Sequence, residues 1–142
     1  MPSKEQKIGE IIASHAAKEG PLLPILHDVQ HEFGCVDVEA EAVIAKALNL
    51  TRAEVHGVVS FYHDFTPTAD PRPVVQICRA EACKARGVEA IIDAAKQAAG
   101  ERVAIHTVYC LGLCSAGPAA RVKDDLHIRL DAAAVAELVE NA

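Results

Sequence analysis

Four cysteines stand in two close pairs in the second half of the chain, and they are the residues best suited to chemistry. Four residues separate Cys78 from Cys83, and three separate Cys110 from Cys114. Thiolates at such spacings form disulfides, bind zinc or hold an iron-sulfur cluster. The 26 residues between the pairs suffice for one helix and one strand, so folding can bring both pairs to one point.

The expected compartment argues against disulfides. Residues 1–7 contain no apolar segment of the kind found in secretory signal peptides, so we expect a cytoplasmic protein with reduced thiols. Zinc is harder to exclude, because four thiolates at these spacings also suit a tetrahedral zinc site. Spacing alone therefore supports zinc and an iron-sulfur cluster equally.

The residues around the second pair favour iron over zinc. A cluster held by thiolates carries negative charge and is stabilised by backbone N–H groups that point at its sulfurs. Gly112 and Gly117 permit such backbone conformations, and Leu111, Leu113 and Pro118 are suited to shield the site from water. A zinc knuckle would more often be polar here.

The elements that position these cysteines begin after a helical first half. Four segments of residues 1–65 carry apolar residues at helical spacing, and each has a capping or stop signal: Ser3 with Gln6, Gly34, Asp37, and Thr51 with Glu54. Residues 1–65 hold 5 lysines and arginines against 10 aspartates and glutamates, and no helix is rich in basic residues. We therefore expect an acidic bundle that docks on a protein and does not bind nucleic acid.

The other potential ligands lie in this bundle and lack partners. His27 and His31 are four residues apart on one helix, but no third ligand follows, so we expect a solvated surface. His56 and His63 are expected to be structural. Cys35 is expected to be a free thiol that packs as a small apolar residue.

Three prolines between residues 66 and 73 mark a boundary. We expect a helical domain over residues 1–66, a linker over 67–73 and a second domain over 74–142. The second domain shows a strand at 74–77, a helix at 87–99, a strand at 103–108, a hairpin of strands 119–122 and 127–130, and a final helix capped by Asp131. A crossover between the first two strands makes them parallel, so both cysteine pairs follow strand ends at one edge.

The absence of enzymatic motifs points to a carrier. No glycine-rich nucleotide loop, nucleophile with a base, or carboxylate pair accompanies the cysteines, so we expect no catalysis by this chain alone. A thioredoxin-type enzyme would need a C-x-x-C pair, which neither segment provides.

At these residues the chain resembles a known family. The four cysteines, Gly117-Pro118 and the upstream segment Gly57-Val58-Val59-Ser60-Phe61-Tyr62 resemble the thioredoxin-like [2Fe-2S] ferredoxin subunits of NAD-linked electron-transfer complexes. The resemblance covers nearly the whole chain. It implies an α+β fold, in which an N-terminal helical bundle precedes a thioredoxin-like α/β domain with a mixed four-stranded sheet. It also implies one [2Fe-2S] cluster, with Cys78, Cys83, Cys110 and Cys114 as its ligands.

The resemblance also implies partners. Such a chain transfers single electrons beside a flavin- and NAD-binding iron-sulfur subunit, in a hetero-oligomer without nucleic acid or membrane insertion. The cations near the ligands would raise the cluster potential, dock the flavin subunit or form an ordinary solvated face; they are Arg79, Lys84, Arg86, Arg121 and Lys123.

The choice of complex rests on length and on the second cysteine segment. The family includes subunits of NADH:quinone oxidoreductase, NAD-reducing hydrogenase and NAD-dependent formate dehydrogenase. The resemblance is greatest to the gamma subunit of the soluble formate dehydrogenase, whose larger catalytic subunit contains molybdenum; it rests on the short 26-residue segment between the pairs, the short chain and the form Tyr109-Cys110-Leu111-Gly112-Leu113-Cys114. A zinc-stabilised protein-interaction module is the alternative of another class.

Overall fold

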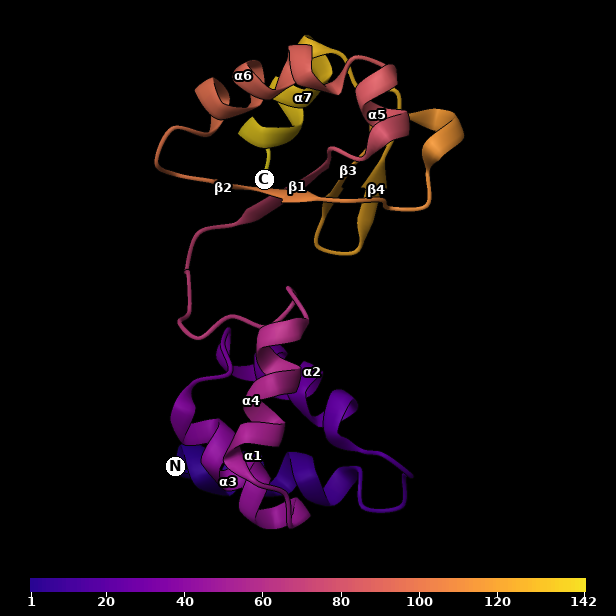
Figure 1. The fold of residues 1–142 in the computed structure, drawn as a ribbon. Coiled ribbons are helices and arrows are strands. Elements are labelled where there is room, and N and C mark those ends of the chain that lie inside the picture. Colours follow the sequence, from indigo (N-terminus) through magenta and orange to yellow (C-terminus); the bar gives the residue numbers. More distant parts are fainter. The chain divides into compact units, whose positions relative to one another are not determined.

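The structure, a computed structural model, describes residues 1–142, which divide into two compact units at residues 1–71 and 72–142 (Figure 1). The first unit holds α1 (Lys4–Ser14), α2 (Leu22–Phe33), α3 (Val38–Leu48) and α4 (Arg52–Phe61). The second holds β1 (Val74–Cys78), α5 (Glu81–Ala85), α6 (Val88–Ala99), β2 (Ala104–Val108), the 3₁₀ turn η1 (Cys114–Ala116), β3 (Ala120–Val122), β4 (Asp125–His127) and α7 (Ala132–Glu140). None of these helices could span a membrane.

The helices of the first unit begin at the capping residues that the sequence predicts. The Ser3 hydroxyl accepts a hydrogen bond from the Gln6 N–H, and the Gln6 side chain accepts one from the Ser3 N–H at 2.7 Å. Thr51 and Glu54 form the same reciprocal pair at the start of α4. Asp37 caps α3 by accepting from the Ala40 N–H at 3.0 Å. These local signals therefore fix three helix starts.

The apolar faces of these four helices meet in one core. Its fully buried members are Ile8, Ile25, Leu26, Val29, Val36, Ala40, Ile44 and Val55. Phe65, which follows α4, is also buried in this core. Burial of a side chain of this size stabilises a fold by about 1.5–3 kcal/mol, so the unit has a substantial core of its own.

The second unit is a mixed four-stranded sheet in the order β2-β1-β3-β4. β1 and β2 are parallel, whereas β3 is antiparallel to both β1 and β4. The predicted α+β architecture with a mixed four-stranded sheet is thus confirmed. α6 and α7 pack on each other and lie over the same face of the sheet (Figure 1).

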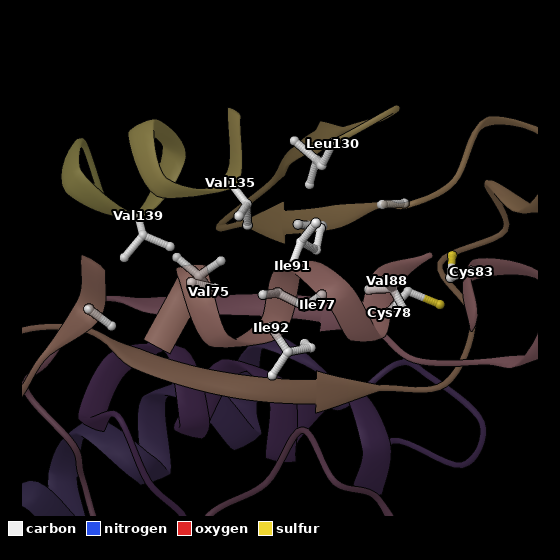
Figure 2. Close-up of a cluster of buried hydrophobic side chains, with 14 of the residues drawn as sticks. Val75, Ile77, Cys78, Cys83, Val88, Ile91, Ile92, Leu130, Val135 and Val139 are labelled. Carbon is white, nitrogen blue, oxygen red and sulfur yellow. The ribbon is translucent and has the colours of Figure 1, made fainter. Parts of the chain in front are cut away.

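The apolar core of this unit lies between the sheet and these helices. β1 contributes Val75 and Ile77, both fully buried, and α6 contributes Val88, Ile91 and Ile92 (Figure 2). Cys78 and Cys83 belong to the same buried cluster and lie together at one end of it (Figure 2). The core therefore holds one of the two cysteine pairs directly.

Two elements differ from the sequence-based expectation. α5 forms between β1 and α6, where no helix was expected. β4 spans Asp125–His127 instead of 127–130, because Lys123 takes a left-handed conformation, with φ 53°, in a two-residue turn. Residues 128–130 leave the ladder and contact another segment, where the Leu130 N–H donates to the Pro118 carbonyl at 3.1 Å.

Candidate functional site

The parallel pairing of β1 and β2 brings the two cysteine segments together. Cys78 is the last residue of β1 and pairs in register with Val108, the last residue of β2. The Arg79 N–H extends this ladder by donating to the Val108 carbonyl at 2.9 Å. The loop that carries Cys110 and Cys114 therefore starts beside Cys78, at the edge that the predicted crossover requires.

Backbone N–H groups point at the sulfurs in this loop. The Cys110 N–H donates to Cys78 Sγ at 3.3 Å, and the Gly112 N–H donates to Cys110 Sγ at 3.3 Å. Gly112 has φ 76°, a conformation that glycine adopts without steric cost. The predicted role of Gly112 in turning an N–H toward a sulfur is thus seen in the structure.

Cys110 itself has φ 90°, which is unusual for a residue with a side chain. Conformations of this kind cost on the order of 1–3 kcal/mol and persist only where surrounding contacts hold them. Here the N–H···Sγ contact with Cys78 is such a contact. The backbone is therefore strained at the residue that joins the two cysteine segments.

Gly117 is important because it has no side chain, which leaves room for the sulfur of Cys83. A Cβ added to Gly117 would lie 2.9 Å from Cys83 Sγ, closer than real Cβ atoms approach other heavy atoms. No N–H from Gly117 to a sulfur is seen, in contrast to the role expected from sequence. Gly117 precedes Pro118 through a cis peptide bond and lets the chain pass directly against Cys83.

The surroundings of the sulfurs shift their thiol pKa values in different directions. Burial is the largest single influence on Cys78 and raises its pKa, but hydrogen bonds from backbone N–H groups and from the Cys83 thiol together bring that pKa below the usual value. Burial raises the pKa of Cys83, and its hydrogen bond with Cys78 raises it further. The pKa of Cys114 is raised first by its hydrogen bond with Cys110. Of these three thiols, Cys78 is therefore the one whose anionic form the backbone supports best.

The four sulfurs form two pairs. Cys110 Sγ and Cys114 Sγ are 3.6 Å apart, and Cys78 and Cys83 lie in one buried cluster, where each shifts the pKa of the other. Two sulfurs at about 2.3 Å from one tetrahedral metal ion are about 3.8 Å apart. No three His, Cys, Asp or Glu side chains gather closely enough to hold a single ion. The donor set therefore fits a group with two metal atoms, each bound by one pair, better than one zinc ion.

The remaining candidates from the sequence lie in the first unit and build no second site. The His27 ring packs on Phe65 at 4.9 Å between centroids, and His31 is exposed. His56 Nδ1 lies 3.1 Å from a carboxylate oxygen of the buried Glu41. Cys35 is a half-buried free thiol, and His63 is exposed.

Sequence reasoning missed α5, the helix that holds Cys83. The signal was present, because residues 81–85 are mostly good helix formers and Gly87 follows them. The segment is only five residues long, and so it shows no apolar periodicity. α5 contacts η1, which begins at Cys114, so it places Cys83 near the second cysteine segment.

Comparison with known proteins agrees with this geometry. The family of thioredoxin-like [2Fe-2S] ferredoxins matches residues 8–142. This chain belongs to that family. Its cofactor is accordingly a [2Fe-2S] cluster, which the two-pair sulfur arrangement fits.

The relatives of this ferredoxin are subunits of larger assemblies. The NADP-reducing hydrogenase subunit HndA of Solidesulfovibrio fructosivorans is 28% identical over 131 residues, which are 86% of this chain and 77% of the relative. The NADH-quinone oxidoreductase subunit 2 of Thermus thermophilus is 30% identical over 122 residues, which are 78% of this chain and 66% of the relative.

A solved structure shares the fold. An NAD⁺-reducing [NiFe]-hydrogenase in its air-oxidized state matches with a TM-score of 0.70 and 27% identity. The match covers 85% of this ferredoxin but 22% of the hydrogenase chain. This ferredoxin therefore corresponds to about a fifth of that polypeptide.

Proposed function

We propose that this ferredoxin is a one-cluster electron-transfer subunit, with Cys78, Cys83, Cys110 and Cys114 as the cluster ligands. The observation that carries the proposal is the meeting of two cysteine pairs at the ends of β1 and β2, with N–H groups donating to Cys78 and Cys110. Cys35 has no part in the site.

The bound cluster supplies one-electron redox chemistry. The protein contributes N–H donors, which stabilise negative charge on the sulfurs. It also excludes water from one side, because Cys78 and Cys83 are buried and Leu111 and Leu113 pack against the apolar core. A drier surrounding and N–H···S contacts are two of the means by which a protein sets a cluster potential.

The partner in this proposal is a flavin- and NAD-binding iron-sulfur subunit. Such a subunit splits the two electrons of a hydride, and a one-electron carrier beside it takes up or stores one of them. The relatives that support this partner are subunits of hydrogenases and NADH-quinone oxidoreductases. The ferredoxin itself turns over no substrate.

For the complete assembly we propose a soluble NAD-dependent formate dehydrogenase with a molybdenum-containing catalytic subunit. The support is the short 26-residue segment between Cys83 and Cys110. The alternative is the equivalent subunit of a hydrogenase or of an NADH:quinone oxidoreductase, which the named relatives favour. Identification of the subunits that copurify with the chain decides between them.

Spectroscopy of anaerobically purified protein tests the cluster proposal. We expect about two irons per chain, visible absorption and an EPR signal after reduction. A colourless protein with one zinc and no iron would instead establish the zinc-stabilised interaction module. Serine at each of the four proposed ligands should reduce iron content and change the EPR signal, whereas the matched Cys35→Ser should leave both unchanged. If one of the four serine variants keeps the wild-type iron content and EPR signal, the cysteine replaced in that variant is not a ligand.

A further inference from the structure

The two cysteine pairs differ sharply in exposure. Cys78 and Cys83 are 2% and 3% exposed, whereas Cys110 and Cys114 are both exposed. A group held by all four sulfurs is therefore shielded by the core on one side and open on the other. An electron partner approaches most closely over the Cys110–Cys114 loop.

An exposed aromatic side chain stands beside this opening. Tyr109, which directly precedes Cys110, is 72% exposed. Large aromatic side chains left in solvent are enriched at protein interfaces, because they bury much area when a partner covers them. Leu111 and Leu113 are half-buried, so their remaining exposed surface adds to the apolar part of the same loop.

The segments that flank the opening carry three cations, although the chain as a whole has a net charge of −6. Lys84 directly follows Cys83, and Arg86 ends α5 with its Cδ 3.3 Å from the position of a Cβ on Gly117. The Arg129 N–H donates to the Ala116 carbonyl at 2.8 Å, which places Arg129 beside η1.

These three cations form no ion pair within the chain. All three are exposed, and the only ion pair nearby joins Arg79 to Glu89 at 2.5 Å. Glu81 is the single acidic residue of α5. The rim of the opening therefore presents more positive than negative charge to an approaching protein, against the sign of the whole molecule.

We propose that this rim, formed by Tyr109, Lys84, Arg86 and Arg129 around the Cys110–Cys114 loop, is the docking surface for a carboxylate-rich face of the electron partner. The inference rests on the proposed function, because it takes that partner to be the flavin- and NAD-binding subunit. Cations in such a rim increase the association rate and orient the partner, and Tyr109 supplies the apolar anchor.

Binding of the flavin subunit that copurifies with this chain tests the proposal. Lys84→Glu with Arg86→Glu, and separately Tyr109→Ala, should each weaken binding of the cluster-loaded chain by at least about tenfold at low salt. The matched controls are Lys96→Glu on α6 and Leu126→Ala on β4; both residues are exposed in the same unit. These controls should change binding less than about twofold, and added salt should weaken wild-type binding.

Amide hydrogen exchange of the unsubstituted chain gives a second measurement of where the flavin subunit binds. Amide hydrogen exchange of the loaded chain should slow at residues 84–86 and 109–114 when the flavin subunit is added. Unchanged binding in both rim variants, or a footprint confined to other segments, would overturn the docking surface. Iron content and the reduced EPR signal of each variant report the cluster separately. A wild-type chain that is purified anaerobically without a cluster, or that copurifies with a complex lacking a flavin subunit, would refute the proposed function itself.

Discussion

Alanine in place of Gly117 should damage the site through one contact. The new Cβ would lie 2.9 Å from Cys83 Sγ and 3.3 Å from the Arg86 Cδ. Optimal separations are about 3.5–4.0 Å for carbon atoms, so the overlap with the sulfur is at least about 0.6 Å. The exposed Arg86 side chain can move away, whereas Cys83 is buried in the core, and we propose it as a cluster ligand.

The expected cost follows from overpacking and not from backbone strain. Gly117 has φ −70° and ψ 166°, an extended conformation that alanine adopts freely. Forcing an extra methyl group into a packed site costs about 1–3 kcal/mol. We therefore expect Gly117→Ala to lower the free energy of unfolding of the cluster-free protein by this amount. We also expect it to lower the iron content of the loaded protein.

A double-mutant cycle tests the cause. Cys83→Ala removes the sulfur, so Gly117→Ala should cost little in that background when urea unfolding of the cluster-free protein is measured. Gly112→Ala is the matched control in the same loop, because no atom lies within 4 Å of its Cβ position but its φ of 76° strains alanine. Its cost should be the same with and without Cys83→Ala. An equal cost of Gly117→Ala in both backgrounds, or full iron content, would refute the steric argument.

Two further predictions concern stability. The pKa of Asp37 is lowered first by the hydrogen bond from Lys4 and then by the hydrogen bond from the Ala40 N–H. The ionised Asp37 carboxylate therefore stabilises the folded state fully above its unfolded pKa of about 3.9, and this contribution is lost as the pH falls through the folded pKa. Asp37→Ala should therefore cost about 1 kcal/mol in urea unfolding at pH 7 and much less near pH 2; equal costs would contradict this. The Arg102 guanidinium donates to the Val139 carbonyl at 2.9 Å. Arg102→Met should therefore lower the free energy of unfolding by about 1 kcal/mol and speed amide hydrogen exchange in the last turn of α7. Unchanged exchange there would contradict this prediction.

Local signals predicted much of the fold. Ser3, Asp37 and Thr51 cap their helices because a cap needs only a side chain and N–H groups three residues away. The meeting of the cysteine segments was likewise predictable, because a right-handed crossover makes β1 and β2 parallel neighbours and both segments follow strand ends.

The remaining features depend on contacts between distant residues. Gly117 lies 34 positions after Cys83, and only the fold shows that a methyl group there would strike the sulfur. β4 ends at His127, and the Leu130 N–H beyond it donates to the Pro118 carbonyl, a contact that no periodicity encodes. The exposure of Cys110 and Cys114 also comes from the fold, since all four cysteines look equivalent in sequence.

The conformation of Cys110 shows why local preference and function conflict at this site. At φ 90°, glycine would remove strain on the order of 1–3 kcal/mol, but it would also remove a sulfur. The backbone N–H of Cys110 donates to Cys78 Sγ at 3.3 Å, while Cys110 Sγ lies 3.6 Å from Cys114 Sγ. One residue thus supplies a donor to the buried pair and a sulfur to the exposed pair. Glycine at this position would keep the N–H donor and lose the sulfur, so cysteine is the residue that provides both contacts in spite of its strained backbone.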